Sequence, residues 1–103
     1  MIKVVANLQF KIERREEFIA AFRGLIPKVR KEDGCIEYAL YFDVDDVLPN
    51  RPARPDVITV LETWAGPEAL QKHVGMPHFV EFIESTKDMM VGLTAQVLSP
   101  DAS

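Results

Sequence analysis

The sequence predicts a single α+β domain over residues 1–103, with its elements in the order β-α-β-β-α-β. At both ends of the chain, apolar residues recur at every second position, which is typical of strands. Two internal stretches place apolar residues three and four positions apart, which is typical of amphipathic helices. A proline-rich loop separates two runs that are rich in β-branched and aromatic residues, so these runs are expected to be neighbouring strands.

The first half of the chain is expected to form a strand over residues 2–9 and a helix over residues 14–31. Within the helix, apolar residues recur at helical spacing from Phe18 to Val29. Pro27 removes one amide donor, so it predicts a kink, or an end to the regular helix near Gly24.

Gly34 is expected to end this helix as a left-handed cap. Strands are then expected over residues 35–44 and 56–65, joined by a loop that contains three prolines. A helix follows in two pieces over residues 67–86, interrupted by a Gly-Met-Pro tripeptide, and residues 92–99 form the last strand. Four strands with two helical crossovers predict a ferredoxin-like sandwich, an antiparallel sheet with helices on one face.

Composition excludes several classes of function. Twelve Lys and Arg against sixteen Asp and Glu give a net charge of −4, so neither nucleic acid nor a membrane surface is an expected partner. No stretch approaches the roughly 20 apolar residues of a transmembrane helix. The single cysteine, Cys35, cannot form an internal disulfide, and the N-terminal segment is too polar for a secretory signal. A cytoplasmic location is therefore expected.

A homodimer is expected because helices can cover only one face of the sheet. In the strand over residues 56–65, Ile58, Val60 and Trp64 share a face, and exposing them would leave a sizeable apolar patch. Covering such side chains stabilises a protein by about 25 cal/mol per Å². Closing two sheets against each other would also leave an apolar cavity suited to a small molecule.

Five polar or aromatic residues are candidates for a site in that cavity. His73 lies on the inward face of its helix and is either a base, because imidazole titrates near neutral pH, or a core histidine. Asn7 lies in a strand, where it is either functional or a cap at the strand end. Trp64 shares a strand face with Glu62, which must be paired or face the cavity if it is buried. Tyr38 offers a phenol donor but is more simply a packing residue.

Other site classes lack their motifs. His73 and His78 are separated by a helix break and share no helical face, so no metal site is predicted. The chain has no glycine-rich phosphate loop and no nucleophile elbow. Cys35 has no basic neighbour to activate it and is interpreted as structural.

Several segments resemble one known family. The helix-to-strand turn over residues 31–38, Lys-Glu-Asp-Gly-Cys-Ile-Glu-Tyr, resembles the E-P/E-G-C-x-x-Y turn of the antibiotic biosynthesis monooxygenase superfamily. Residues 62–64, 69–73 and 77–79 resemble its E-x-W…A-L-x-x-H…P-H-F signature. Residues 25–29 and the proline-rich loop resemble the bacterial quinol monooxygenase branch. The spacing holds across nearly the whole chain.

The resemblance implies a dimeric α/β-barrel that oxidises a quinol or another phenolic small molecule with O₂, without cofactor, metal or flavin. It implies that His73 accepts the substrate proton, that Asn7 donates a hydrogen bond to the developing oxyanion and that Trp64 walls the pocket. The implied substrate-binding residues are Tyr38, Glu62, Phe79 and Phe82.

Three alternatives stay open at this point. Haem-degrading members of the superfamily use an Asn, a Trp and a His, although no haem-specific pattern is present. The fold also supports an isomerase or lyase acting on a small phosphorylated or keto sugar, for which Arg51 and Arg54 could reach a pocket mouth. The third alternative is a non-catalytic binding module, because a fold alone does not guarantee activity.

Overall fold

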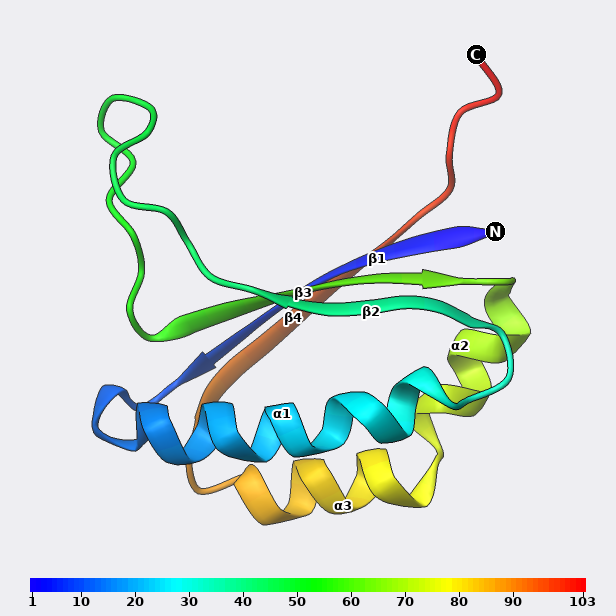
Figure 1. Cartoon of the computed structure of the whole chain (residues 1–103), viewed down its shortest axis with the longest axis horizontal. Helices are drawn as coiled ribbons and strands as arrows, with labels where there is room; N and C mark the ends of the chain where they lie inside the picture. The colour runs from blue at the N-terminus through cyan, green and yellow to red at the C-terminus, as the bar shows by residue number, and fades with distance from the viewer.

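The computed structural model describes residues 1–103 and contains one four-stranded antiparallel sheet with all three α-helices on one face (Figure 1). The strands are β1 (Ile2–Phe10), β2 (Cys35–Tyr41), β3 (Val57–Trp64) and β4 (Met90–Leu98). The helices are α1 (Arg15–Arg30), α2 (Pro67–Val74) and α3 (Pro77–Thr86), and a 3-10 turn, η1 (Ile12–Arg14), precedes α1. The predicted ferredoxin-like order, with its second helix in two pieces, is confirmed. None of the helices combines the length and apolar character needed to cross a bilayer.

The sheet order is β2-β3-β1-β4, so the first strand lies in the middle, next to the last. Its register with β3 places Val4 opposite Glu62 and Ala6 opposite Val60. Because side chains alternate along a strand, these four residues all point to the face covered by the helices. The outer face of the sheet carries the intervening residues, Asn7 among them.

The core lies between the sheet and α1, and α1 supplies it with one stripe of side chains. Five residues of this helix are buried: Phe18, Ile19, Phe22, Leu25 and Val29. The Phe22 ring lies 5.6 Å from the ring of Phe82 in α3 and 5.9 Å from that of Tyr38 in β2. Each such burial stabilises the fold by roughly 1.5–3 kcal/mol, so the stripe predicted from the sequence positions α1 and α3 over the sheet.

The helix predicted over residues 14–31 is confirmed, because α1 continues past Pro27 to Arg30, and it does not end near Gly24. Pro27 is exposed, so its ring projects into solvent and leaves the packing of the helix undisturbed. Leu25 and Val29 flank it on the opposite face and are 3% and 0% exposed. Their burial offsets the one backbone hydrogen bond that proline cannot form.

The prediction that Ile58, Val60 and Trp64 form an uncovered apolar face of β3 is wrong. Ile58, Val60 and Trp64 are at most 1% exposed and lie beneath the helices of their own chain. The expected exposed patch on this face is therefore absent. The face turned away from the helices is the more polar one. In β3 it carries Thr59, which is half-buried, and Thr63.

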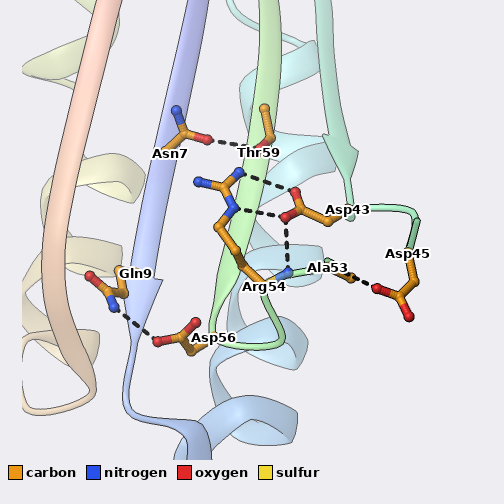
Figure 2. Close-up of polar contacts among 8 residues, drawn as sticks. All are labelled: Asn7, Gln9, Asp43, Asp45, Ala53, Arg54, Asp56 and Thr59. Atoms are coloured by element: carbon orange, nitrogen blue, oxygen red, sulfur yellow. Dashed lines mark hydrogen bonds and ion pairs between the residues drawn. The ribbon is translucent and has the colours of Figure 1, made fainter. Parts of the chain in front are cut away.

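The proline-rich loop over residues 42–56 projects beyond the sheet on the side away from α1 and α3 (Figure 1). Strand β2 ends at Tyr41 instead of residue 44, because the chain then turns to make a local ion pair. The Asp43 carboxylate accepts hydrogen bonds from Nε of Arg54 at 2.7 Å and from its backbone amide at 2.9 Å, and a backbone amide farther along the loop binds Asp45 (Figure 2). The hydrogen bonds from Arg54 lower the pKa of Asp43.

Candidate functional site

A cavity of about 210 Å³ lies between the helix-facing side of the sheet and the helices α2 and α3. Alternate residues of β1 form its floor, and Leu93, Ala95 and Val97 of β4 form one flank. Glu62 and His73 are the only lining residues that are neither apolar nor aromatic. The cavity is therefore a mostly apolar site with a few convergent polar groups, as small-molecule sites usually are.

Five of the seven predicted site residues line this cavity: Tyr38, Glu62, His73, Phe79 and Phe82. Trp64 is completely buried just behind the wall, with its ring centroid 4.8 Å from that of His73. The ring of Phe79 lies 4.6 Å from His73 on another side. The imidazole is thus held between two aromatic rings.

Glu62 is a buried carboxyl group that keeps one oxygen available to the cavity. Its Oε1 accepts a hydrogen bond from Nε1–H of Trp64 at 2.9 Å. Oε2 has no partner within the chain, yet no buried polar atom is left unsatisfied, so this oxygen is open to the cavity that Glu62 lines. Burial raises the pKa of Glu62 to about 6; the hydrogen bond from Trp64 opposes this shift, and the negative charge of Glu32 adds to it. Near neutral pH, Glu62 is therefore a carboxylate that can accept a hydrogen bond or a proton.

Tyr38 brings a phenol group to the same cavity. Its ring packs edge-on against His73 at 5.6 Å, and the residue is 3% exposed. The hydroxyl forms no hydrogen bond within the chain and is not sealed in the core. Burial, together with the charges of Glu62 and Glu32, raises the pKa of Tyr38. The group therefore stays protonated and can donate a hydrogen bond to a bound molecule.

His73 is oriented by a carboxylate on the side away from the cavity. Its Nδ1 lies 3.1 Å and 2.9 Å from the two oxygens of Glu32. A carboxylate can only accept, so Nδ1 carries the proton in the neutral ring and Nε2 holds the lone pair. Nε2 has no partner within the chain. The arrangement of a carboxylate, an imidazole and an open acceptor nitrogen is that of a general base.

Asn7 is not brought to this site. It points to the outer face of the sheet, where its Oδ1 accepts a hydrogen bond from the Thr59 hydroxyl at 2.9 Å (Figure 2). Its neighbours in β1, Ala6 and Leu8, line the cavity on the opposite face. Asn7 therefore cannot touch a ligand in the cavity of its own chain.

Glu32 and His78 carry no sequence signal of their own that predicts a role. The two histidines share no helical face, as expected, but the break between α2 and α3 lets both rings reach one carboxylate: Nε2 of His78 lies 2.6 Å from Oε2 of Glu32. Glu32 stands in the turn before Gly34 and Cys35, the segment whose pattern carried the family resemblance. No group of three or more His, Cys, Asp or Glu side chains is arranged to hold a metal ion.

The basic residues of the loop do not serve the cavity. Arg54 pairs with Asp43, and Arg51 donates to loop carbonyl groups. Neither lines the cavity of its own chain, where the isomerase or lyase alternative would need them. Cys35 is half-buried, and burial together with two nearby carboxylates raises the pKa of its thiol, which is consistent with a structural role.

Comparisons with known proteins place this chain in a family. The sequence model described as antibiotic biosynthesis monooxygenase matches residues 1–85, most of the chain. The chain belongs to the antibiotic biosynthesis monooxygenase family. The match covers the segments that hold Tyr38, Glu62 and His73, and β4 follows it to complete the sheet.

The chain is also similar to individual known proteins. The "Probable quinol monooxygenase YgiN" of Escherichia coli K12 is 26% identical over 97% of this chain and 98% of its own length. An uncharacterized protein of Synechocystis is 33% identical over 86% of this chain, which spans only 55% of that relative. The crystal structure of a conserved protein from Methanosarcina mazei is 28% identical, covers 97% of this chain with 92% of its own, and superposes with a TM-score of 0.83.

Proposed function

We propose that this chain is a monooxygenase that oxidises a quinol or another phenolic small molecule with O₂ and needs no metal, flavin or other cofactor. One observation carries the proposal. An apolar cavity presents three polar atoms without partners, the hydroxyl of Tyr38, Oε2 of Glu62 and Nε2 of His73. A donor, a carboxylate and a base on an apolar wall suit a flat aromatic molecule with one or two hydroxyl groups.

In the proposed reaction, the substrate is itself the reductant. Nε2 of His73 takes the proton of the substrate hydroxyl, and the adjacent Glu32 carboxylate stabilises the resulting imidazolium. Tyr38 donates a hydrogen bond to the substrate anion, and Glu62 accepts one from a second hydroxyl of a quinol. The rings of Phe79 and Phe82 pack against the substrate and exclude water.

The electron-rich anion then reduces O₂. For a quinol, the balance is quinol plus O₂ to hydroxyquinone plus water, with one oxygen atom entering the ring. For a phenol with a free ring position, it is phenol plus O₂ to quinone plus water. One oxygen atom becomes the second carbonyl, and the other leaves as water with the hydroxyl and ring hydrogens. No further reductant is required, so the tasks of the protein are deprotonation, stabilisation of the anion and exclusion of water.

We further propose that the active form is a homodimer. Strand β4 lies at the edge of the sheet and exposes apolar side chains that contribute to the cavity, Leu93 at 47% and Val97 at 58%. A second copy that covers this strand would close the cavity on its open flank. The mass in solution tests this directly, because a chain that stays monomeric at micromolar concentration contradicts it. The cytoplasmic location stays a prediction from composition.

Oxygen uptake by the purified protein tests the activity. A panel of hydroquinones and naphthols is supplied in a chelator-treated buffer, and oxygen consumption is recorded together with the quinone absorption band. Uptake of one O₂ per quinone or hydroxyquinone formed, without release of hydrogen peroxide, supports the proposal. A Soret shift on adding haem, without quinol oxidation, would favour the haem-degrading alternative. Tight binding of the panel compounds without turnover would favour a binding module.

A further inference from the structure

Glu32 joins the cavity to a groove on the opposite side of α3. The residue lies between α1 and β2, and its side chain is 5% exposed. On one side it binds the ring of His73, which is 3% exposed and belongs to the cavity. On the other side it binds the ring of His78, which is 18% exposed and lines a groove between α1 and α3. The three side chains thus span the layer between a dry cavity and solvent.

The two histidines are the groups that form ion pairs with this carboxylate. Lys31 and Lys72 lie beside the same surface pocket as Glu32, but neither forms an ion pair with it. A buried carboxylate without a counter-charge is strongly unfavourable. Two imidazolium rings sharing one carboxylate would repel each other across a few ångströms. The arrangement therefore favours one positive charge, carried by one ring at a time.

Each histidine has its remaining nitrogen directed to a different environment. Nδ1 of His73 and Nε2 of His78 are used by Glu32. The other nitrogen of each ring has no partner within the chain and is not sealed from its surroundings. For His73 these surroundings are the cavity, and for His78 they are the groove that also contains Lys28 and Glu81.

We propose that His73, Glu32 and His78 form a charge relay in which His78 exchanges protons with solvent on behalf of His73. In the resting state the charge that neutralises Glu32 lies on His78, whose ring is the more exposed, and the buried ring of His73 keeps an open Nε2. When Nε2 of His73 takes a proton from a bound phenol, Nδ1 of His78 releases one to water. The positive charge moves from His78 to His73, and no proton has to cross the carboxylate.

The relay rests on the proposed function for its substrate proton, but its central claim can be tested without turnover. The chain contains only two histidines, so ¹⁵N-labelled histidine gives one set of NMR signals for each ring. Near pH 6.5, where an ordinary imidazole is about half protonated, the wild-type protein should show His78 as the charged ring. His73 should be neutral, with its proton on Nδ1.

A matched pair of variants tests the coupling between the rings. His78→Gln keeps an N–H donor for Glu32 but cannot carry the charge, so the imidazolium signal should appear on His73 at the same pH. Lys28→Gln removes a cation from the same groove without touching Glu32, and it should leave His73 neutral. If His73 has the same charge state in all three proteins, the relay is wrong. If His78→Gln does not fold, two rings charged together in the wild-type protein would still overturn it.

Other charged groups around the cluster must be held constant in this comparison. His73 is faced from the sheet by Tyr38 and Glu62. His78 is faced by Lys28 of α1 and Glu81 of α3. The pocket beside Glu32 is also lined by Lys31, Asp33 and Lys72. Glu32→Gln removes the shared anion and leaves the other groups in place. In this variant the charge state of each ring should no longer depend on the other. Adding His78→Gln to Glu32→Gln should therefore leave the charge state of His73 unchanged.

Binding of 4-nitrophenol links the relay to the cavity, because the colour of the compound reports its ionisation. In the wild-type protein the anion should bind, with the His73 signal becoming that of an imidazolium and the His78 signal that of a neutral ring. In His78→Gln, where His73 already carries the charge, the anion should bind without changing the His73 signal. If 4-nitrophenol does not bind at all, the proposed ligand class fails, while the NMR comparison of the free proteins still decides the relay.

Discussion

The indole of Trp64 donates its only hydrogen bond to Glu62, which stands two residues earlier on the same face of β3. The two side chains point in the same direction because a strand repeats every two residues. The pair therefore buries a tryptophan completely while it fixes one oxygen of a carboxylate at the edge of the cavity. This contact connects the stability of the sheet to the electrostatics of the site.

Glu62→Gln is expected to stabilise the protein near neutral pH. Burial raises the pKa of Glu62 from 4.5 to about 6 in the folded chain, so folding favours its protonated form. The stability that this group contributes is complete below about pH 4.5, and it decreases as the pH rises through about 6. By linkage, the loss at neutral pH is about 2 kcal/mol. Glutamine keeps an oxygen acceptor for Trp64 and never ionises.

Urea unfolding at about pH 4 and about pH 7.5 measures this effect. The difference in unfolding free energy between Glu62→Gln and wild type should increase by about 2 kcal/mol between the two conditions. Glu16→Gln removes an exposed carboxylate from α1 and serves as the control. A constant difference across the pH range would show that Glu62 is not the buried acid described.

Trp64→Phe should raise the pKa of Glu62 further, because the lost hydrogen bond is the contact that lowers it. The substitution should also destabilise the fold by about 2–3 kcal/mol, since it removes both buried surface and a charge-assisted hydrogen bond. Carbon NMR of the labelled Glu62 carboxyl follows the first effect. Phe18→Leu, a loss of buried aromatic surface outside the cavity, should destabilise the fold without moving the Glu62 titration. Equal titrations in all three proteins would rule out this role for the indole.

The sequence predicts the elements of this fold well because their signals are local. The stripe from Phe18 to Val29 repeats with the period of a helix, and burial of that stripe holds α1 together across Pro27. The covered face of β3 was not predictable in this way. Its strand carries apolar residues on both parities, Val57 and Leu61 on one and Ile58 and Val60 on the other. Only the packing of α1 and α3 decides which set is buried.

The sequence predicts those residues of the candidate site whose inward direction follows from the pattern of a single helix or strand. His73 on α2 and Glu62 on β3 could be recognised from the burial of their neighbours. Glu32 could not, because its partners follow it by 41 and 46 residues and meet it only after α2 and α3 have packed. Asn7 was misplaced for a similar reason: a polar residue in a strand does not reveal which face of the sheet it will occupy.

His73→Ala should reduce quinol turnover by more than about tenfold while the fold persists, because it removes the proposed proton acceptor. Steady-state oxygen uptake on the best compound of the panel gives kcat, and far-UV circular dichroism checks the fold. Gln71→Ala changes an exposed residue of the same helix and should leave kcat unchanged. Wild-type kcat in a folded His73→Ala protein would remove His73 from the mechanism.

The turn at Gly34 packs closely against Ala69 of α2, so a side chain at position 34 should displace this helix. Its φ of +82° lies in the left-handed region, and a Cβ built on it would lie only 2.6 Å from Cβ of Ala69. Gly34→Ala must therefore strain the turn and push away the helix that carries His73. We expect a destabilisation of about 2–4 kcal/mol, together with a fall in activity. Gly24→Ala has nothing within 4 Å of its Cβ and should instead stabilise α1, by about 0.5–1 kcal/mol.

The double variant Gly34→Ala/Ala69→Gly separates the collision from the backbone strain. Ala69→Gly alone should cost about 1 kcal/mol, because it places glycine within a helix. If the two methyl groups collide, the double variant should be more stable than the sum of the single variants by about 1 kcal/mol or more. Its kcat should also recover, because α2 can return to the sheet. Additive free energies and an unrecovered kcat would mean that strain at Gly34 alone accounts for the loss, and that the turn does not position His73 through Ala69.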